Sequence, residues 1–340
     1  MLKKHRSWGS RFASLTVQSL GFGAIALYAA NAGQAASPPP TNLYAALGDS
    51  ITAGTFAETR IASWNATAKA PFDFSSPEAL AAYFNLGARA PQMGSKELYY
   101  RIENKGTLSW ASGQQISSQF MRLGQHLKQS GDKAGLTVMN VAVPAERAAS
   151  MESQAQLIVN AMKTGKYKAL KYVTLLVGAN DTCSYESDVG TPNDKMAVQL
   201  GKAFAKLAEI EQAEPIRILV SSLPPIPDLG ETRFLTARTL LHLSCREFRD
   251  HVLRFCNPMT VWSTPQEYQD HVKIVEDKNE VLRQAALTAQ RTFANLDVRY
   301  TDNLYHTGLD PALLAGDCFH PNEDGQSLLS EKMWSEQPWF

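Results

Sequence analysis

Short runs of apolar and β-branched residues alternate along the chain with longer stretches in which apolar residues recur every three or four positions. The apolar runs lie at Leu43–Leu47, Leu136–Val143, Tyr172–Val177, Ile216–Ser221 and Leu296–Tyr300. Runs of this kind are typical of parallel strands buried on both faces, and the stretches between them are typical of crossover helices. The pattern predicts an α/β protein: a three-layer α/β/α sandwich around a mainly parallel, five-stranded sheet.

Four stretches between the strands have a helical period. They are Gln114–Lys128, Ala149–Met162, Lys195–Glu211 and Val272–Phe293. In the third, Met196, Leu200 and Phe204 recur at four-residue spacing, which indicates one apolar face packed on a sheet. Two other segments, Thr55–Trp110 and Pro224–Tyr268, are longer than a connection requires. Such insertions commonly form the walls or lid of a functional site.

The first 35 residues resemble an export signal. Basic residues such as Lys3 and Arg6 come first, an apolar run from Leu20 to Ala30 follows, and small residues lead to Ala35. This is the order of a secretory signal peptide, with cleavage expected near Ala35. An uncleaved anchor is the alternative, although the run is shorter than the ~18–20 apolar residues of a spanning helix. We therefore expect a secreted or periplasmic protein, with a Pro-rich linker at 36–42 and one domain at 43–340.

Composition narrows the class of protein. Hydrophobic residues make up 44% of the chain, which fits a folded globular protein. The 33 basic and 33 acidic residues balance, and removal of the leader with its four basic residues leaves a net charge of −4. No basic stripe is present, so we expect no nucleic-acid partner. Contact with a membrane after cleavage is expected to be peripheral at most, and the oligomeric state is left open.

Export also changes how the cysteines are interpreted. The chain has four of them, at Cys183, Cys245, Cys256 and Cys318. In an oxidising compartment one or two disulfides are expected. Three pairings are possible, and the spacing does not choose among them. No CxxC pair or matching histidine spacing indicates a zinc site.

Polar motifs follow four of the five predicted strands. They are Gly48-Asp49-Ser50, Pro144-Ala145, Gly178-Ala179-Asn180-Asp181 and, shortly after the last strand, Gly316-Asp317-Cys318-Phe319-His320. Ligands of open parallel sheets bind at the carboxyl ends of the strands, where these motifs would meet. The sequence therefore predicts a functional site at this edge.

A serine hydroxyl becomes a nucleophile only when a base accepts its proton. Of the seven histidines, only His320 has a carboxylate three residues earlier, where one turn would let Asp317 accept from Nδ1–H and leave Nε2 facing Ser50. Donors for a developing oxyanion could come from the Asn180 amide and from the backbone N–H groups of Ser50 and Ala145.

Each motif also has an ordinary explanation. Asp49 and Ser50 could cap a helix, Gly-x-Asn-Asp is a common turn, and an isolated Asp-x-x-His is usually not catalytic. Their occurrence in order at strand ends of one sheet favours the site. A G-x-S-x-G elbow of the α/β-hydrolase type is excluded, because Thr52 occupies the position of the final glycine of that motif.

Together, Gly48-Asp49-Ser50, Asn180 and Asp317-x-x-His320 resemble the GDSL, or SGNH, hydrolase family. Leu108–Gly113 and the Asp-Cys-Phe-His sequence ending at His320 are most similar to its phospholipase B-like lipases. The resemblance implies a flavodoxin-like sheet, no metal or organic cofactor, and ester hydrolysis through an acyl-enzyme.

The resemblance also implies roles for the motif residues. Ser50 would be the nucleophile, His320 the base and then the acid, Asp317 its orienting group and Asn180 an oxyanion donor. The chain departs from the family at Ala145, where a glycine is usual. The N–H of Ala145 would remain a donor if φ is negative there.

The sequence thus predicts an exported serine ester hydrolase that acts on carboxylic esters, with lipid or phospholipid acyl esters as the first hypothesis. The alternative within enzymes is an esterase that removes small acyl groups, such as acetyl, from glycans. The alternative outside enzymes is a binding module that keeps the fold and lacks the chemistry.

Overall fold

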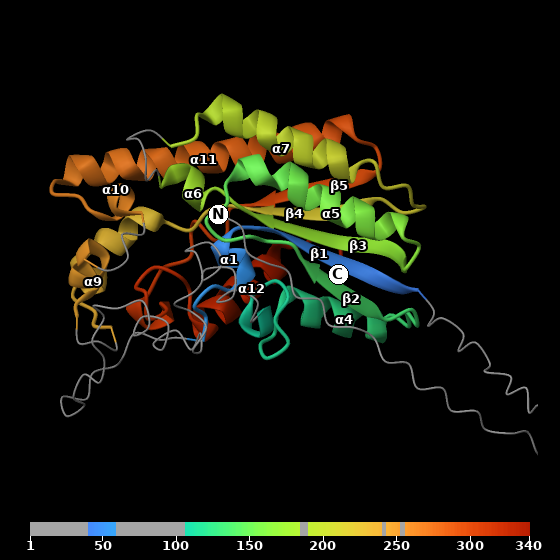
Figure 1. Ribbon diagram of the computed structural model, residues 1–340, viewed down its shortest axis with the longest axis horizontal. Helices are drawn as coiled ribbons and strands as arrows, with labels where there is room; N and C mark the ends of the chain where they lie inside the picture. The colour runs from blue at the N-terminus through green and yellow to red at the C-terminus, as the bar shows by residue number, and fades with distance from the viewer. Residues whose placement is uncertain (1–39, 59–105, 184–189, 240–242, 252–255) are drawn as a thin grey trace, which may run out of the picture. The chain divides into compact units, whose positions relative to one another are not determined.

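Five parallel strands form one sheet in the computed structural model, which describes residues 40–58, 106–183, 190–239, 243–251 and 256–340. The spatial order of the strands is β2-β1-β3-β4-β5 (Figure 1). Their bounds are Thr41–Gly48 for β1, Leu136–Asn140 for β2, Tyr167–Leu176 for β3, Ile216–Ser221 for β4 and Leu296–Thr301 for β5. The prediction of an α/β fold with a flavodoxin-like parallel sheet is confirmed.

The register of the sheet brings three of the sequence motifs together. Gly48 at the end of β1 pairs with Leu176 at the end of β3, and Ala46 pairs with Asn140 at the end of β2. The segments that follow β1, β2 and β3 therefore leave the sheet at neighbouring points of one edge. This geometry is a direct result of parallel pairing.

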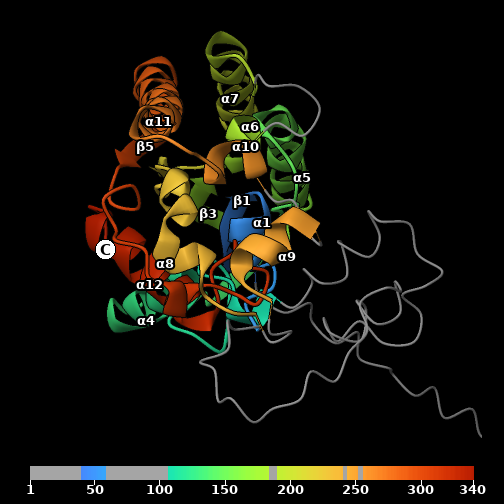
Figure 2. The same cartoon turned by 90° about the vertical axis from the view of Figure 1, so that its left-hand side faces the viewer.

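Helices cover both faces of the sheet (Figures 1 and 2). On one face lie α5 (Met151–Lys163), α7 (Asn193–Leu207) and α11 (Pro265–Thr292), and on the other lie α4 (Gln119–Gln129) and α12 (Glu323–Glu336). As predicted, the buried side of α7 includes Met196, Leu200 and Phe204. The apolar core lies between these layers and includes the strand residues from Leu43 to Leu47.

Two helices start five or more residues from the position that the periodicity predicted. α4 begins at Gln119 rather than Gln114, because the Ser118 side chain accepts from the Met121 N–H and caps the helix there. α11 begins at Pro265 rather than Val272. There Thr264 and Glu267 form a reciprocal capping box, a signal that is visible in the sequence as Thr-Pro-x-Glu.

Two strands also differ from their predicted bounds by three or more residues. β3 begins at Tyr167, five residues before the predicted start, because its first half alternates between half-buried and exposed residues instead of forming an apolar run. β2 ends at Asn140 rather than Val143. Asn140 Oδ1 accepts from the Ala142 N–H at 3.1 Å, while the N–H groups of Val141 and Val143 still donate to carbonyls of β1.

Short elements follow the strand ends and fill the second predicted insertion. Near the motifs lie α1 (Ser50–Ala53), η2 (Gly106–Leu108), η3 (Ala148–Ser150), α6 (Ala179–Thr182) and η5 (Pro311–Leu313). The segment predicted at Pro224–Tyr268 carries η4 (Ile226–Gly230), α8 (Thr232–Leu235), α9 (Cys245–His251) and α10 (Asn257–Thr260). Figure 2 is seen from the end of the molecule at which α8, α9 and α10 lie.

Two disulfides tie this segment to the strand ends. Cys183 pairs with Cys256, and Cys245 pairs with Cys318. The structure thus selects one of the three pairings that the sequence left open, and both of its bonds start from the second insertion. Each bond reaches a loop that carries one of the sequence motifs.

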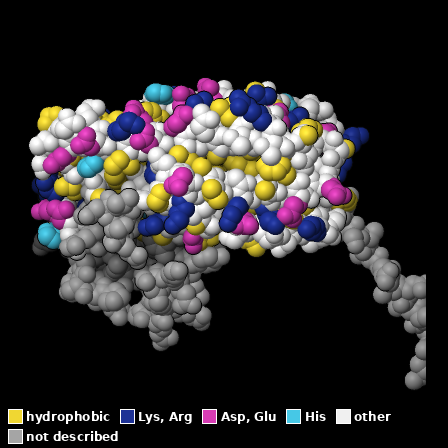
Figure 3. All heavy atoms as spheres, turned by 90° about the horizontal axis from the view of Figure 1, so that it is seen from above, with side chains coloured by type: hydrophobic (Ala, Val, Ile, Leu, Met, Phe, Trp, Pro, Cys, Tyr) yellow, Lys and Arg dark blue, Asp and Glu magenta, His cyan; other side chains and the backbone are white. Residues whose placement is uncertain are grey.

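The predicted leader at 1–35 and most of the first insertion, including residues 59–105, lie outside the described residues. Within the described part of the chain, no helix has the length and apolar character needed to cross a membrane. Figure 3 shows the face over α5, α7 and α11, where basic and acidic side chains are intermixed. Exposed ion pairs such as Lys206–Glu209 and Arg283–Glu280 lie on or beside these helices.

Candidate active site

Ser50 is the first residue of α1, directly after the turn that ends β1, and it is 4% exposed to solvent. Asp49 caps this helix, since its Oδ1 accepts from the Ile51 N–H at 3.0 Å. Capping and a chemical role were alternative explanations of the motif. Here Asp49 fulfils the first, while the Ser50 hydroxyl remains directed toward a histidine.

Close packing around Gly48 makes the turn possible. A Cβ atom at this position would lie 2.3 Å from Thr52 Oγ1 and 2.4 Å from the Leu176 carbonyl oxygen, so no larger residue fits. The buried Gln154 side chain of α5 bonds to both backbone groups of Gly48. Its Oε1 accepts from the Gly48 N–H at 3.0 Å, and its Nε2 donates to the Gly48 carbonyl at 2.9 Å.

His320 and Ser50, 270 positions apart in sequence, form a hydrogen bond with 2.8 Å between Nε2 and Oγ. On the other side of the ring, His320 Nδ1 lies 2.5 Å from Asp317 Oδ2. Asp317 Oδ1 accepts from the backbone N–H groups of Phe319 at 3.1 Å and His320 at 3.0 Å. The structure therefore brings together the three residues that the sequence singled out, in the predicted order.

The three groups are shielded from water. Asp317 is fully buried and His320 is 1% exposed. The rings of Phe56 and Phe319 lie with their centroids 5.6 and 5.1 Å from that of the imidazole. Because Nδ1–H donates to a carboxylate, Nε2 is the nitrogen that can accept the serine proton, and the dry surroundings strengthen the attraction between an imidazolium and Asp317.

A second buried carboxylate lies beside the pair. Asp49 is fully buried, and burial raises its pKa to about 7, against the lowering effects of the Ile51 N–H and of His320. Its Oδ2 has no hydrogen-bond partner among the described residues. Near neutral pH this carboxyl is therefore divided between its protonated and its charged form.

The predicted oxyanion donors lie on three neighbouring segments. Asn180 is the second residue of α6, and its Nδ2 donates to the Glu146 carbonyl at 2.9 Å. An amide nitrogen carries two hydrogens, so this bond orients the group and leaves one hydrogen for a ligand. Within the described residues, the backbone N–H groups of Ser50 and Ala145 have no acceptor. These three N–H groups are therefore available as donors to a ligand.

The condition that φ is negative at Ala145 is not met. Ala145 has a φ of 57°, in the left-handed region that costs a non-glycine residue roughly 1–2 kcal/mol. The turn after Pro144 imposes this conformation, and the alanine side chain is exposed, so the methyl group meets no wall. The residue therefore adopts the backbone that a glycine would adopt, and its N–H is retained.

The sequence did not predict the polar side chains that donate to the backbone carbonyls of α1. Ser109 Oγ donates to the Thr52 carbonyl at 2.7 Å, and Asn140 Nδ2 donates to the same carbonyl at 3.0 Å. Gln326 of α12 donates to the Ile51 carbonyl at 3.2 Å and accepts from the Trp110 N–H at 2.8 Å. The Leu108–Gly113 motif thus packs against α1, although nothing in its spacing indicates that contact.

No group of three or more His, Cys, Asp or Glu side chains in the described part of the chain could hold a metal ion. The chemistry that this arrangement can perform is nucleophilic: a hydroxyl with an adjacent, oriented base and nearby N–H donors.

Comparison with known proteins relates the chain to hydrolases. The family model described as GDSL-like Lipase/Acylhydrolase matches residues 44–333. A human (Homo sapiens) protein, phospholipase B1, membrane-associated, is 26% identical over 211 residues, which are 58% of this chain. The matched part is 14% of the length of that protein, so the chain spans only a small share of it.

Among solved structures, a lipase from a goat rumen metagenome is 14% identical, with a TM-score of 0.42, and the match covers 87% of this chain and 97% of that one. An acetyl xylan esterase from Geobacillus stearothermophilus is 12% identical, with a TM-score of 0.40 and coverage of 89% and 98%. Neither likeness bears on the substrate of this chain.

Proposed function

The chain belongs to the GDSL-like lipase/acylhydrolase family and is a carboxylic ester hydrolase, and from this premise we propose that it cleaves lipid or phospholipid acyl esters with Ser50, His320 and Asp317. The observation that carries the proposal is the 2.8 Å contact between Ser50 Oγ and His320 Nε2, with Asp317 bonded to the opposite ring nitrogen. Such an arrangement supplies the base that a serine nucleophile requires.

In the proposed reaction, Ser50 Oγ attacks the ester carbonyl carbon while His320 Nε2 takes the hydroxyl proton. The carbonyl oxygen becomes an oxyanion, which accepts from Ser50 N–H, Ala145 N–H and Asn180 Nδ2. The C–O bond to the alcohol then breaks, and the alcohol leaves with the proton from His320. Water repeats the sequence on the acyl-enzyme: His320 takes its proton, the acid departs, and Ser50 regains its hydrogen.

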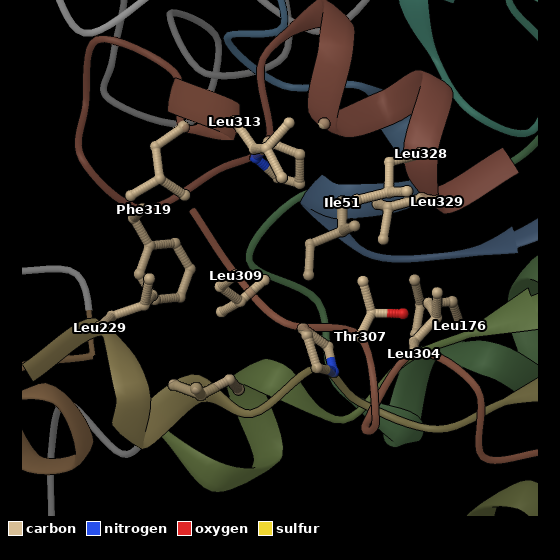
Figure 4. Close-up of a pocket in the computed structure, with 15 residues that line it drawn as sticks. Ile51, Leu176, Leu229, Leu304, Thr307, Leu309, Leu313, Phe319, Leu328 and Leu329 are labelled. Carbon is tan, nitrogen blue, oxygen red and sulfur yellow. The ribbon is translucent and has the colours of Figure 1, made fainter. Parts of the chain in front are cut away.

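An apolar pocket beside the site supports acyl chains as ligands. Its walls include Ile51, the neighbour of Ser50, and Phe319 and Pro321, the neighbours of His320. Figure 4 shows Ile51 and Phe319 on opposite sides of it, with Leu309 and Leu313 between them. Among the described residues that line it, only Thr307 carries a polar side chain. A glycan would find almost no hydrogen-bond partner there.

The cavity within these walls is small, about 50 Å³. A single water needs about 10–15 Å³ on this scale, so the cavity has room for only the first few methylenes of a chain. Each buried methylene contributes about 0.8 kcal/mol, or about fourfold in kcat/KM. We therefore propose that chain length is sensed over those first carbons and that longer chains extend beyond the pocket.

The proposed place of action is outside the cytoplasm. Two disulfides in the described part of the chain fit an oxidising compartment. The order of basic, apolar and small residues in 1–35 fits export, followed by a single hydrolase domain at 43–340. Any membrane contact is proposed to be peripheral.

A chain-length series of p-nitrophenyl esters from acetyl to palmitoyl tests the substrate class. We expect kcat/KM to rise by about fourfold per carbon over the first few carbons beyond acetyl and then to level off. A maximum at acetyl, with turnover of acetylated xylan, would support the small-acyl esterase instead. Ser50→Ala should abolish turnover in a protein with an unchanged melting temperature.

Labelling with a fluorophosphonate tests the nucleophile independently of the substrate. We expect one label, at Ser50, and none in the Ser50→Ala variant. Folded protein that takes up no label and hydrolyses no ester in the series would favour the binding module over the enzyme.

A further inference from the structure

Helix α9, in the second insertion, is attached to the loop that carries His320 and Asp317. Cys245, its first residue, forms a disulfide with Cys318, which lies between the two. One helical turn after Cys245, Arg249 points toward the same loop. Its guanidinium nitrogen Nη2 donates to the Cys318 carbonyl at 2.5 Å. The helix therefore holds Cys318 both through its side chain and through its backbone.

Arg249 is an unusual residue for a surface insertion, because it is only 1% exposed. Its Nη1 donates to the Leu229 carbonyl at 2.8 Å, and its Nε has no partner among the described residues. Burial lowers the pKa of Arg249 to about 10, against the raising effects of the Asp317 and Asp250 charges. The side chain is thus a buried cation at neutral pH, and Asp317 is the carboxylate that stabilises it most.

The loop needs such support, because Cys318 has a φ of 63°. A non-glycine residue in this region costs roughly 1–2 kcal/mol and persists only where its surroundings impose it. Here the imposed conformation lets Asp317 Oδ1 accept from the N–H groups of Phe319 and His320, so that Oδ2 faces His320 Nδ1. Released from its anchors, the loop would be free to turn the imidazole away from Ser50.

We propose that Arg249 is a positioning residue of the hydrolase: by binding the Cys318 carbonyl next to Asp317, and with the Cys245–Cys318 disulfide as a second anchor, it fixes His320 against Ser50. Arg249 touches neither Ser50 nor an ester, so it acts only through the loop. The second insertion therefore contributes to the reaction itself as well as to the surroundings of the site. This inference rests on the proposed function.

Three variants test the proposal. Arg249→Met removes the charge and both bonds, Arg249→Lys keeps the charge and can reach one carbonyl, and Arg246→Met is the matched control at an exposed position of the same helix. Misplacement of a catalytic group by about 1 Å costs about 100-fold in rate, and we expect such a loss for Arg249→Met, in kcat rather than in KM. Arg249→Lys should lose about tenfold, because an ammonium cannot reproduce the fork of a guanidinium. Arg246→Met should behave as the unaltered protein.

A spectroscopic readout separates this inference from the proposed function. The Nδ1–H proton of His320, bonded to Asp317, should give a downfield NMR resonance that is sharp in the unaltered protein and in Arg246→Met. It should broaden or vanish in Arg249→Met, whether or not an ester is turned over. An inert protein would refute the proposed function, while this resonance would still decide the role of Arg249.

A folded Arg249→Met protein with kcat/KM within about twofold of the unaltered enzyme and an unchanged Nδ1–H resonance would overturn the proposal. Circular dichroism and the melting temperature show whether the variants fold. Where Arg249→Met does not fold, Arg249→Lys decides, and full activity with an unchanged resonance in that variant overturns the proposal equally.

Discussion

Gln154 of α5 forms two hydrogen bonds with the backbone of Gly48, one to its N–H and one to its carbonyl. Gly48 lies two residues before Ser50, so these bonds hold the peptide from which the turn to the proposed nucleophile starts. The glutamine side chain is 3% exposed, and water is therefore not available to replace it. A helix on one face of the sheet thus sets the geometry at its edge.

Replacement of Gln154 by leucine should reduce both stability and rate. Two buried backbone groups would lose their partner, at about 1–3 kcal/mol for each unsatisfied group. We expect a lower urea midpoint and a fall of at least about tenfold in kcat, because the Ser50 turn is no longer held. Gln156→Leu on the same helix, where the one side-chain bond to a described residue is to Asn160, is the control and should change neither. Equal values for the two variants would contradict this role of Gln154.

Ala145 offers a graded test of the left-handed turn. Ala145→Gly removes a strain of roughly 1–2 kcal/mol and adds roughly 0.5–1 kcal/mol of chain entropy to the unfolded state. The free energy of unfolding should rise by up to about 1.5 kcal/mol, with activity kept. Ala145→Val, with a β-branched residue in that region, should lose both stability and activity. Urea denaturation and kcat/KM of the glycine and valine variants measure these effects. A valine variant with unchanged stability and activity would show that the turn tolerates negative φ.

Asp49 should make stability fall as the pH rises. Its pKa is raised from 3.8 to about 7 in the folded protein, so the folded state keeps a proton that the unfolded state releases. The free energy of unfolding therefore decreases through this interval and stays lower above it. Asp49→Asn keeps an acceptor for the Ile51 N–H and removes the titration, so its decrease should be smaller by on the order of a few kcal/mol.

Urea unfolding at a series of pH values measures this difference. Burial raises the pKa of Asp181 as well, but that carboxyl is present in both proteins, so the comparison isolates Asp49. Parallel curves for the two proteins would show that the buried carboxyl at position 49 does not titrate in this range.

Replacement of Lys278 of α11 should lower the stability of the protein more than replacement of Lys273 on the same helix. Lys278 is 5% exposed, donates to the Thr191 carbonyl and to Asn193 Oδ1, and faces the buried Asp181. Lys278→Met leaves the Thr191 carbonyl and Asn193 Oδ1 without their buried donor and leaves Arg147 as the remaining cation that lowers the pKa of Asp181, which we expect to cost about 1–3 kcal/mol. Lys273→Met breaks only an exposed pair with Asp277 and should cost less than about 1 kcal/mol. Melting temperatures of the two variants decide the matter, and equal shifts would contradict it.

The parts of the site that could be predicted from the sequence are those fixed by short spacing and by sheet topology. Asp317 and His320 are one turn apart, so their contact needs only local geometry. Ser50 and Asn180 follow the adjacent strands β1 and β3. They lie at one edge of the sheet, because parallel pairing brings the carboxyl ends of these strands together. The sheet itself could be predicted, because strands buried on both faces leave near-continuous apolar runs in the sequence.

The rest depends on long-range packing that leaves no periodic signal. Gln154 and Arg249 are polar residues within helices, and in sequence they look like surface positions. The disulfide pairing depends on how residues 224–268 fold back over the strand ends, and no spacing rule determines it. Ala145 adopts a positive φ although alanine disfavours it, because the loop on which it lies outweighs the local preference.

Because Ser50 and His320 are 270 positions apart, the proposed mechanism has a consequence for biosynthesis. In a partly synthesised chain the proposed nucleophile would be present without its base, and it would stay inert until the loop that carries His320 has docked. Hydrolysis would then appear all at once at the end of folding, and the cell that makes the protein would be protected from it during production.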